Sequence, residues 1–137
     1  MPFTVLIYAY RKPGTTPTAF KTHYESKYVP LIQSLAGVHF PQSHNRFYIR
    51  SEEPDTNDNY PATVLVGTQP DFEYDALTEV TFEDATKFQT FMGIMGEDDA
   101  KEKIAQDEEM FLDRARMTAV VVGEIEVTKG SAYATNE

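Results

Sequence analysis

The sequence predicts an α+β domain built on a four-stranded antiparallel sheet with its helices on one face. Four stretches rich in β-branched and aromatic residues alternate with amphipathic stretches in the order β-α-β-β-α-β, which is the order of a ferredoxin-like fold. The chain has 137 residues, of which 41% are hydrophobic and 12% aromatic, enough for one domain with a packed core. We place that domain at residues 1–130 and expect residues 131–137 to form a flexible C-terminal tail.

The first strand and the start of the first helix have clear local signals. Residues 3–10 contain β-branched and aromatic side chains without a breaker and are expected to form a strand. The strand ends at the turn sequence Lys12-Pro13-Gly14. Thr16 suits an N-cap and Pro17 suits the first helical position, so a helix should begin there.

The stretch FKTHYESKYVPL, residues 20–31, places one histidine and two tyrosines on an amphipathic helix. Its apolar face repeats every three or four residues. Pro30 lacks a backbone N–H and its ring clashes with the preceding turn, so we expect a break or kink near residues 28–29. A short second helix should then cover residues 30–36 and close at Gly37.

The second half of the chain supplies the other strands and helices. Residues 62–67 are ambiguous between an extra edge strand and an extended lining segment. The remaining expected elements are strands over 43–50, 73–82 and 117–127, and helices from Glu83-Asp84 to Gly93 or Gly96 and over 98–112.

The apolar character of the first and last predicted strands indicates a homodimer. The stretches 3–10 and 117–127 are apolar on both faces, whereas a sheet with helices on one side should expose a polar face to water. Packing two sheets together would bury this apolar area, at roughly 25 cal/mol per Å².

Composition excludes several classes of function. The chain has 22 acidic and 12 basic side chains, a formal charge of −10, which argues against binding to nucleic acid or to anionic membranes. The absence of cysteine excludes disulfides, thiolate metal sites and a cysteine nucleophile. No apolar run reaches the length of a membrane span, and the N-terminus lacks the order of a signal peptide. We therefore expect a cytoplasmic protein.

The candidate catalytic residues are titratable side chains on predicted inner faces. His23 lies on the apolar side of the first helix, where a core-edge histidine bonded to a backbone carbonyl is an equal alternative; Tyr28 lies one turn beyond Tyr24 on the same side. His44 shares one side of its strand with Arg46, and this side could face either solvent or the cavity. Asp75 could orient a histidine or act as a base, with an ion pair across the sheet as the alternative.

A cavity between the first helix and the sheet should take a flat, phenolic ligand. Arg46 could bind a carboxylate or phenolate with its planar fork of donors. The three histidines lack metal-ligand spacing, and no glycine-rich phosphate loop occurs, so we expect neither a metal nor another cofactor. The residues expected to bind substrate are Tyr8, Tyr24, Phe40, Arg46, Phe88 and Phe91. The acid-rich runs GEDD and QDEE are expected to form solvated helix faces.

Three sequence blocks, taken in order, resemble the EthD family of dimeric α+β barrel proteins. They are RKPGTTPTAFKTHYESKYVPLIQSLAG, SHNRFYI and YDALTEVTFED. The resemblance covers residues 5–127 and is closest to fungal members found beside aromatic polyketide pathways, often described as dehydratases or decarboxylases. It implies a homodimer with a small aromatic ligand. Members of this fold class carry out many reactions, so function must be argued from the site.

One position departs from the family pattern. The resemblance implies His-x-Pro at the end of the first helix, where this chain has Tyr28-Val29-Pro30. A phenol, with a pKa near ~10, is a poor general base near neutral pH but can donate a hydrogen bond. The base should therefore be His44 or His23.

These observations predict a lyase of the dehydratase type that acts on an aromatic or polyketide-derived intermediate by general acid/base catalysis. A neutral imidazole would remove a proton next to a carbonyl, and Tyr28 or Arg46 would stabilise the enolate. Decarboxylation, cyclisation or a pericyclic step, oxygenation without a cofactor, and non-catalytic ligand binding are the alternatives on the same ligand class.

Overall fold

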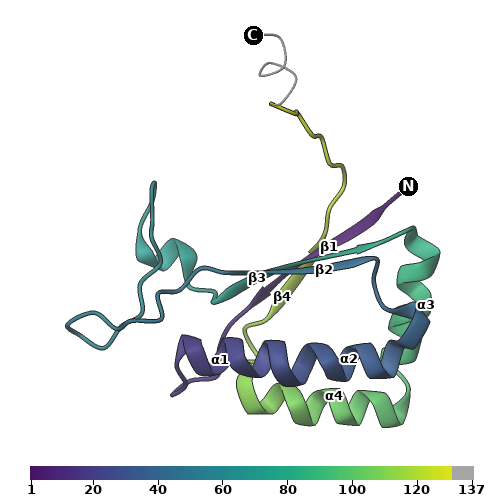
Figure 1. Cartoon of the computed structure of the whole chain (residues 1–137), viewed down its shortest axis with the longest axis horizontal. Helices are drawn as coiled ribbons and strands as arrows, with labels where there is room; N and C mark the ends of the chain where they lie inside the picture. The colour runs from purple at the N-terminus through teal and green to yellow at the C-terminus, as the bar shows by residue number, and fades with distance from the viewer. Residues whose placement is uncertain (131–137) are drawn as a thin grey trace.

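The computed structural model of the chain describes residues 1–130; the predicted tail, residues 131–137, lies outside the described residues. Four strands and four α-helices are joined by one π-helical and two 3₁₀ turns (Figure 1). The elements are β1 (Phe3–Ala9), α1 (Pro17–His23), the π-helical turn (Tyr24–Tyr28), α2 (Val29–Ala36), a 3₁₀ turn (Gly37–His39), β2 (Ser43–Tyr48), a second 3₁₀ turn (Gln69–Phe72), β3 (Ala76–Phe82), α3 (Ala85–Met95), α4 (Asp98–Phe111) and β4 (Thr118–Val121).

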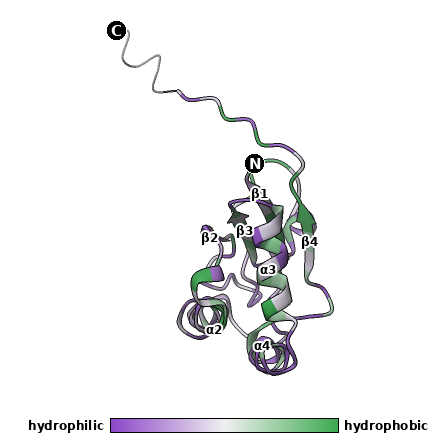
Figure 2. Ribbon diagram, turned by 90° about the vertical axis from the view of Figure 1, so that its right-hand side faces the viewer, coloured by the Kyte–Doolittle hydropathy of each residue, from purple (hydrophilic) through white to green (hydrophobic). Residues whose placement is uncertain are grey.

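The strands form one antiparallel sheet in the order β2-β3-β1-β4. This arrangement of a β-α-β-β-α-β chain is ferredoxin-like and confirms the predicted fold class. The helices α1, α2 and α4 lie on the same side of the sheet (Figure 1). Figure 2, which views α2 and α4 nearly along their axes, shows the two helices side by side beneath the strands.

The first helix begins as predicted, and its regular hydrogen-bond pattern is interrupted close to the expected position, by a π-helical turn that ends at Tyr28. The hydroxyl of Thr16 accepts a hydrogen bond from the backbone N–H of Ala19 at 3.1 Å, and Pro17 occupies the first turn. A π-helical turn then joins α1 to α2, and the N–H of Val29 donates to the carbonyl of Tyr24. This wider turn shifts the hydrogen-bond ladder before Pro30, so the helix accommodates the missing N–H and continues.

The predicted end of the last strand is wrong, and the strand alternative for residues 62–67 does not hold. β4 ends at Val121 rather than at residue 127, because Val121 pairs with Val5 and β1 begins only two residues before Val5. The chain therefore runs past the end of its partner strand after the bond from Val122 to the carbonyl of Thr4 at 2.9 Å. Residues 62–67 do not form a strand; only Ala62 makes an isolated bridge, to Arg50.

The core lies between the sheet and the helices and centres on Phe111. This side chain is 2% exposed and packs against Phe20, Tyr24 and Tyr28 with ring centroids 5.2–5.6 Å apart. Along β3 the residues alternate between buried and half-buried positions, as the sequence pattern predicts. The even-numbered residues of β3 therefore face the helices.

The opposite face of the sheet carries apolar side chains. Phe47 on β2 and Val120 on β4 are 49% and 53% exposed, and neither points toward the helices. Within residues 1–130, no helix is both long and apolar enough to cross a membrane.

Candidate active site

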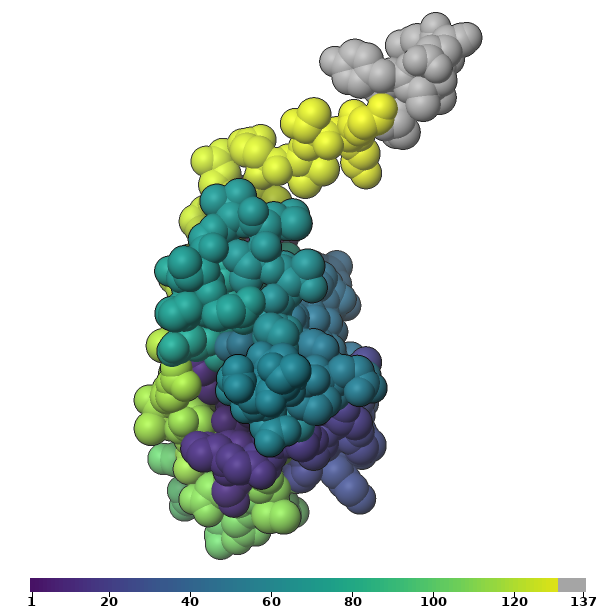
Figure 3. All heavy atoms as spheres, turned by 90° about the vertical axis from the view of Figure 1, so that its left-hand side faces the viewer, coloured from purple at the N-terminus to yellow at the C-terminus, as the bar shows by residue number. Residues whose placement is uncertain are grey.

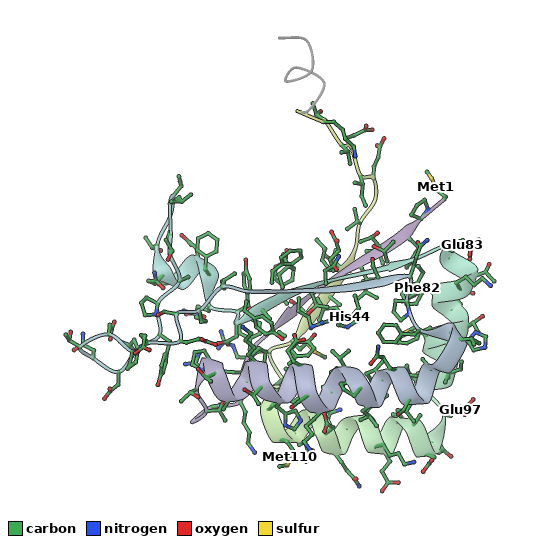
Figure 4. All side chains as sticks on the ribbon, viewed as in Figure 1. Met1, His44, Phe82, Glu83, Glu97 and Met110 are labelled. Atoms are coloured by element: carbon green, nitrogen blue, oxygen red, sulfur yellow. The ribbon has the colours of Figure 1, made fainter. Side chains whose placement is uncertain are left out.

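An apolar cavity of about 300 Å³ lies between the sheet and the helices. Its lining is almost entirely aliphatic, aromatic and methionine side chains, and the polar exceptions are Tyr24, Tyr28 and His44. Figure 4 shows His44 on the helix side of β2, between the strand and α2. The apolar lining residues are Val5, Ile7, Ala9, Ile32, Val80, Phe82, Phe88, Phe91, Met92, Met95, Ile104, Leu112, Met117 and Ala119.

Arg46 contacts the ring of His44, and Glu25 in turn binds Arg46. The Nη1 atom of Arg46 lies 2.7 Å from Nδ1 of His44 and also donates to the backbone carbonyl of His44 at 2.8 Å. Glu25 in turn accepts two hydrogen bonds from Arg46, at 2.6 and 3.2 Å, and one from Tyr48 at 2.5 Å. The hydrogen bond from Arg46 lowers the pKa of the Glu25 carboxyl, so this array is an anchored ion pair at the back of the histidine.

The contact with Arg46 determines the tautomer of His44. A guanidinium only donates hydrogen bonds, so Nδ1 must be the acceptor and the proton of the neutral ring resides on Nε2. Burial, and secondarily the charge of Arg46, lower the pKa of His44 to about 4. His44 is therefore neutral at physiological pH and presents an N–H donor rather than a base.

Tyr24 is a buried phenol whose partner is another hydroxyl. Its Oη lies 2.7 Å from Oγ1 of Thr78, which is fully buried on β3. Burial raises the pKa of Tyr24 to about 12. Its ring stands between those of Tyr28 and His44, with centroid separations of 5.6 and 6.3 Å.

Tyr28 donates a hydrogen bond to Glu108 at 2.6 Å. Glu108 lies on α4, is 7% exposed and accepts a second bond from Nε of Arg114 at 3.2 Å. Burial, and then the charge of Glu108, raise the pKa of Tyr28 well above its usual value. Sequence reasoning missed Glu108, because the run QDEE was expected to be a solvated face; the helical position of Glu108 beside the buried Phe111 was the available signal.

His23 lies away from the cavity. Its ring stacks on Phe111 at 4.5 Å, and its Nε2 lies 3.1 Å from Oδ2 of Asp107 on α4. The structure thus separates the two alternative candidates for the base: His44 lines the cavity, whereas His23 joins α1 to α4.

Asp75 is buried in an ion-pair cluster at the other end of the sheet. It accepts hydrogen bonds from both the backbone N–H and the guanidinium of Arg11, at 2.8 and 2.5 Å, and Nε of Arg50 lies 4.0 Å away. The cluster borders a polar hollow of about 530 Å³, on the side where the N-terminal segment after β1 and the loop after β2 lie together (Figure 3). Asp75 therefore forms ion-pair contacts with arginines, which was the alternative to a catalytic role.

Three of the residues expected to bind substrate do not line the cavity. Tyr8 points to the opposite face of the sheet, where it packs edge-on against Tyr74 at 5.1 Å, because Ile7 and Ala9 occupy the inward positions of β1. Phe40 stacks on His44 at 6.0 Å but borders a separate hollow. Arg46 also lies behind His44 rather than on the cavity wall. Tyr24, Phe88 and Phe91 line the cavity.

Across residues 1–130, no three histidine, aspartate or glutamate side chains come together in a group that could hold a metal ion. The polar groups of the cavity itself are the phenols and the imidazole described above. Because the hydroxyl of Tyr28 already donates to Glu108, Nε2 of His44 is the group in this set best placed to donate a hydrogen bond to an oxygen atom of an otherwise apolar ligand.

The fold and the cavity define an α+β protein with a ferredoxin-like sheet and an apolar site between the sheet and the helices. The profile of the EthD domain family matches residues 12–115, and the chain belongs to this family. No functionally curated protein matches the sequence.

Solved structures share this fold at low sequence identity. An ethyl tert-butyl ether D (EthD) family protein from Bacillus halodurans has a TM-score of 0.55 at 18% identity, covering 90% of this chain and 99% of its own. An EthD-like protein from Ralstonia eutropha has a TM-score of 0.55 at 14% identity, covering 95% and 96%. A hypothetical protein from Arabidopsis thaliana has a TM-score of 0.50 at 13% identity, covering 93% and 92%.

Proposed function

We propose that this protein is a lyase of the dehydratase type, which removes water from a small aromatic or polyketide-derived ketone by acid/base chemistry. The observation that carries the proposal is His44: a neutral imidazole lines the apolar cavity while its Nδ1 is occupied by Arg46. The proposed chemistry needs no cofactor.

A neutral N–H donor suits the first step of such an elimination. Removal of a proton next to a carbonyl places negative charge on the carbonyl oxygen, and a donor already directed at that oxygen stabilises the enolate. A neutral imidazole can fill this role, because it polarises the carbonyl without first transferring a proton. Among the apolar side chains of the cavity, the interaction is stronger than in bulk water, because the local dielectric constant is lower. We therefore assign enolate stabilisation to His44, supported from behind by Arg46.

The cavity restricts the ligand by size and polarity. Ligand sites commonly measure about 300–1,000 Å³, so a cavity of about 300 Å³ suits one or two fused rings. Aromatic rings on α3 and the methionines beside them favour a flat, apolar body. The sequence resemblance to fungal members associated with aromatic polyketides supports the same substrate class in secondary metabolism.

The test uses α-tetralone, a bicyclic aryl ketone, as a probe for proton removal next to a carbonyl. In D₂O, the wild-type protein should exchange the α-protons of the ketone faster than buffer does, as followed by ¹H NMR. His44→Phe keeps a ring but removes the donor, and loss of one such donor costs about 10²–10³-fold in rate. His39→Phe is the matched control, because His39 is exposed and does not line this cavity. Equal rates for His44→Phe and wild type would contradict the proposal.

Two further assays separate the alternative reactions. Carbon dioxide release from a β-keto acid would indicate decarboxylation, and oxygen consumption would indicate an oxygenase. Arg46, the residue expected to hold a carboxylate, is already paired with Glu25, which favours elimination over decarboxylation. Probe binding without exchange by the wild-type protein would instead favour a non-catalytic binding module.

We also propose that the protein is a homodimer joined through the outer face of the sheet. Phe47 and Val120 are half-exposed there, and the neighbouring Tyr8 packs on the same side. A second copy would remove this apolar surface from water without needing another protein.

A further inference from the structure

We propose that Tyr28 and Glu108 are the proton-accepting pair of this site: Tyr28 contacts the substrate, and Glu108 receives the proton through it. This inference rests on the proposed function and supplies the base that His44, as a donor, cannot be. Nothing in the family match assigns a role to either residue.

The two phenols of the cavity differ in the hydrogen-bond partner of their hydroxyl group. The hydroxyl of Tyr24 meets the hydroxyl of Thr78 at 2.7 Å, which cannot hold an extra proton near neutral pH. The hydroxyl of Tyr28 meets a carboxylate oxygen of Glu108 at 2.6 Å. A carboxylate can accept a proton, so only Tyr28 has an outlet for its own proton when it takes one from a ligand.

The surroundings of Glu108 make Tyr28 the route to it from the cavity. Glu108 is 7% exposed and does not line the cavity, whereas Tyr28 does. Its other oxygen, Oε1, is held by Nε of Arg114 at 3.2 Å. Arg114 thus fixes the carboxylate with Oε2 directed at the phenol, so the pair is already aligned for proton transfer.

The step balances within the substrate and these side chains. The C–H bond next to the carbonyl breaks, its proton forms a bond to Oη of Tyr28, and the proton of Tyr28 moves to Oε2 of Glu108. The electron pair of the C–H bond enters the enolate, whose oxygen accepts a hydrogen bond from Nε2 of His44. When the enolate expels hydroxide from the neighbouring carbon, the proton returns from Glu108 through Tyr28, and water leaves.

This pair accounts for a tyrosine at the end of the first helix. A free phenol is a weak base at neutral pH, because its conjugate acid would have to form before its own proton leaves. A phenol bonded to a carboxylate avoids that intermediate, since one proton leaves as the other arrives. The departure from His-x-Pro at Tyr28 is therefore compatible with base catalysis.

The test measures α-tetralone exchange in D₂O at saturating probe, with the dissociation constant of the probe measured separately by ligand-observed NMR. Tyr28→Phe and Glu108→Gln should each lower the exchange rate by about 10²-fold or more, the range for one proton-transfer partner, and leave the dissociation constant within about twofold. Tyr74→Phe and Glu102→Gln are the matched controls, because Tyr74 lies outside the cavity and Glu102 is exposed on α4, and both should retain the wild-type rate.

A third variant separates proton acceptance from a structural role. Glu108→Asp keeps a carboxylate but shortens the side chain. Glu108→Gln keeps the size of the side chain but removes the carboxylate that could take up a proton. Proton acceptance predicts that Asp regains part of the rate and Gln does not; a packing role predicts the reverse order. If Glu108 variants fail to fold by circular dichroism, Tyr28→Phe, which removes one oxygen, decides alone.

The outcomes distinguish the two proposals. If His44→Phe loses exchange while Tyr28→Phe and Glu108→Gln retain it, the proton-accepting pair is wrong and the proposed function stands. If wild-type protein binds α-tetralone without exchanging its protons, both proposals are overturned.

Discussion

Nη1 of Arg46 lies 2.7 Å from Nδ1 of His44. Because the arginine can only donate, this contact leaves the ring proton on Nε2. Glu25 fixes the arginine in turn, so three side chains from the first helical segment and β2 determine one property of the cavity, which is the presence of a neutral N–H donor.

The first prediction concerns this tautomer. In ¹⁵N-labelled protein, His44 should show a protonated Nε2 and an unprotonated Nδ1, and it should titrate with a pKa of about 4. Long-range ¹H–¹⁵N NMR spectra at pH 3.5–8 measure both properties. A His44 that titrates near 6.5, the value of a solvated histidine, would contradict the described burial and contact with Arg46.

The same NMR measurement on a Glu25 variant tests whether Glu25 helps to fix the tautomer of His44. Glu25→Gln weakens the double hydrogen bond to Arg46, so a mixture of the two His44 tautomers should appear. Glu79→Gln is the control, because Glu79 accepts only an exposed bond from Asn45 at 3.2 Å. An unchanged tautomer in Glu25→Gln would mean that Arg46 holds its position without Glu25.

The second prediction is a pH dependence of stability. The pKa of His44 is lower in the folded protein, about 4, than in the unfolded chain, about 6.5, so the unfolded chain binds more protons between these values. The free energy of unfolding should therefore fall as the pH drops from about 6.5 to about 4, by roughly 3 kcal/mol at most from this residue. Urea unfolding of wild type and His44→Phe across this range isolates the effect as their difference, and a difference that does not change with pH would contradict it.

The third prediction tests the core. Phe111→Ala removes the ring that contacts Phe20, Tyr24 and Tyr28, and such truncations cost about 3–5 kcal/mol. Thermal or urea unfolding measures the loss. Met110→Ala, one residue earlier and 65% exposed, should change the free energy of unfolding by less than about 0.5 kcal/mol. Similar losses in both variants would show that Phe111 is not the centre of the core.

The fourth prediction concerns assembly. Wild-type protein should elute as a dimer in size-exclusion chromatography with light scattering, and Phe47→Glu should be monomeric, because a buried charge on the outer sheet face opposes association. Glu53→Lys, an exposed change in the loop after β2, is a charged control that should remain dimeric. A monomeric wild-type protein at micromolar concentration would rule out the proposed dimer.

Most of the fold could be predicted because its signals are local. Thr16 and Pro17 mark a helix start through capping and a fixed φ angle, and the alternation along β3 follows from the pleat of a strand. The remaining features depend on context that the sequence pattern does not report. Pro30 is accommodated by a π-helical turn, and β4 stops at Val121 because its partner β1 begins only two residues before Val5.

The site was less predictable, since it depends on which elements face one another. The side of β2 that carries His44 was identified from alternation, but the sequence could not indicate that Arg46 would occupy Nδ1. Glu108 was overlooked because an acidic run on a helix normally faces solvent. Its bond to Tyr28 joins residues 80 positions apart in the chain, a separation that local patterns do not report.

The most direct test of the account is a crystal structure of the protein with α-tetralone. We expect the ketone inside the apolar cavity, with its carbonyl oxygen about 3 Å from Nε2 of His44 and its α-carbon beside Oη of Tyr28. A ketone bound outside this cavity, or one inside it with its carbonyl directed away from His44, would contradict the proposed function.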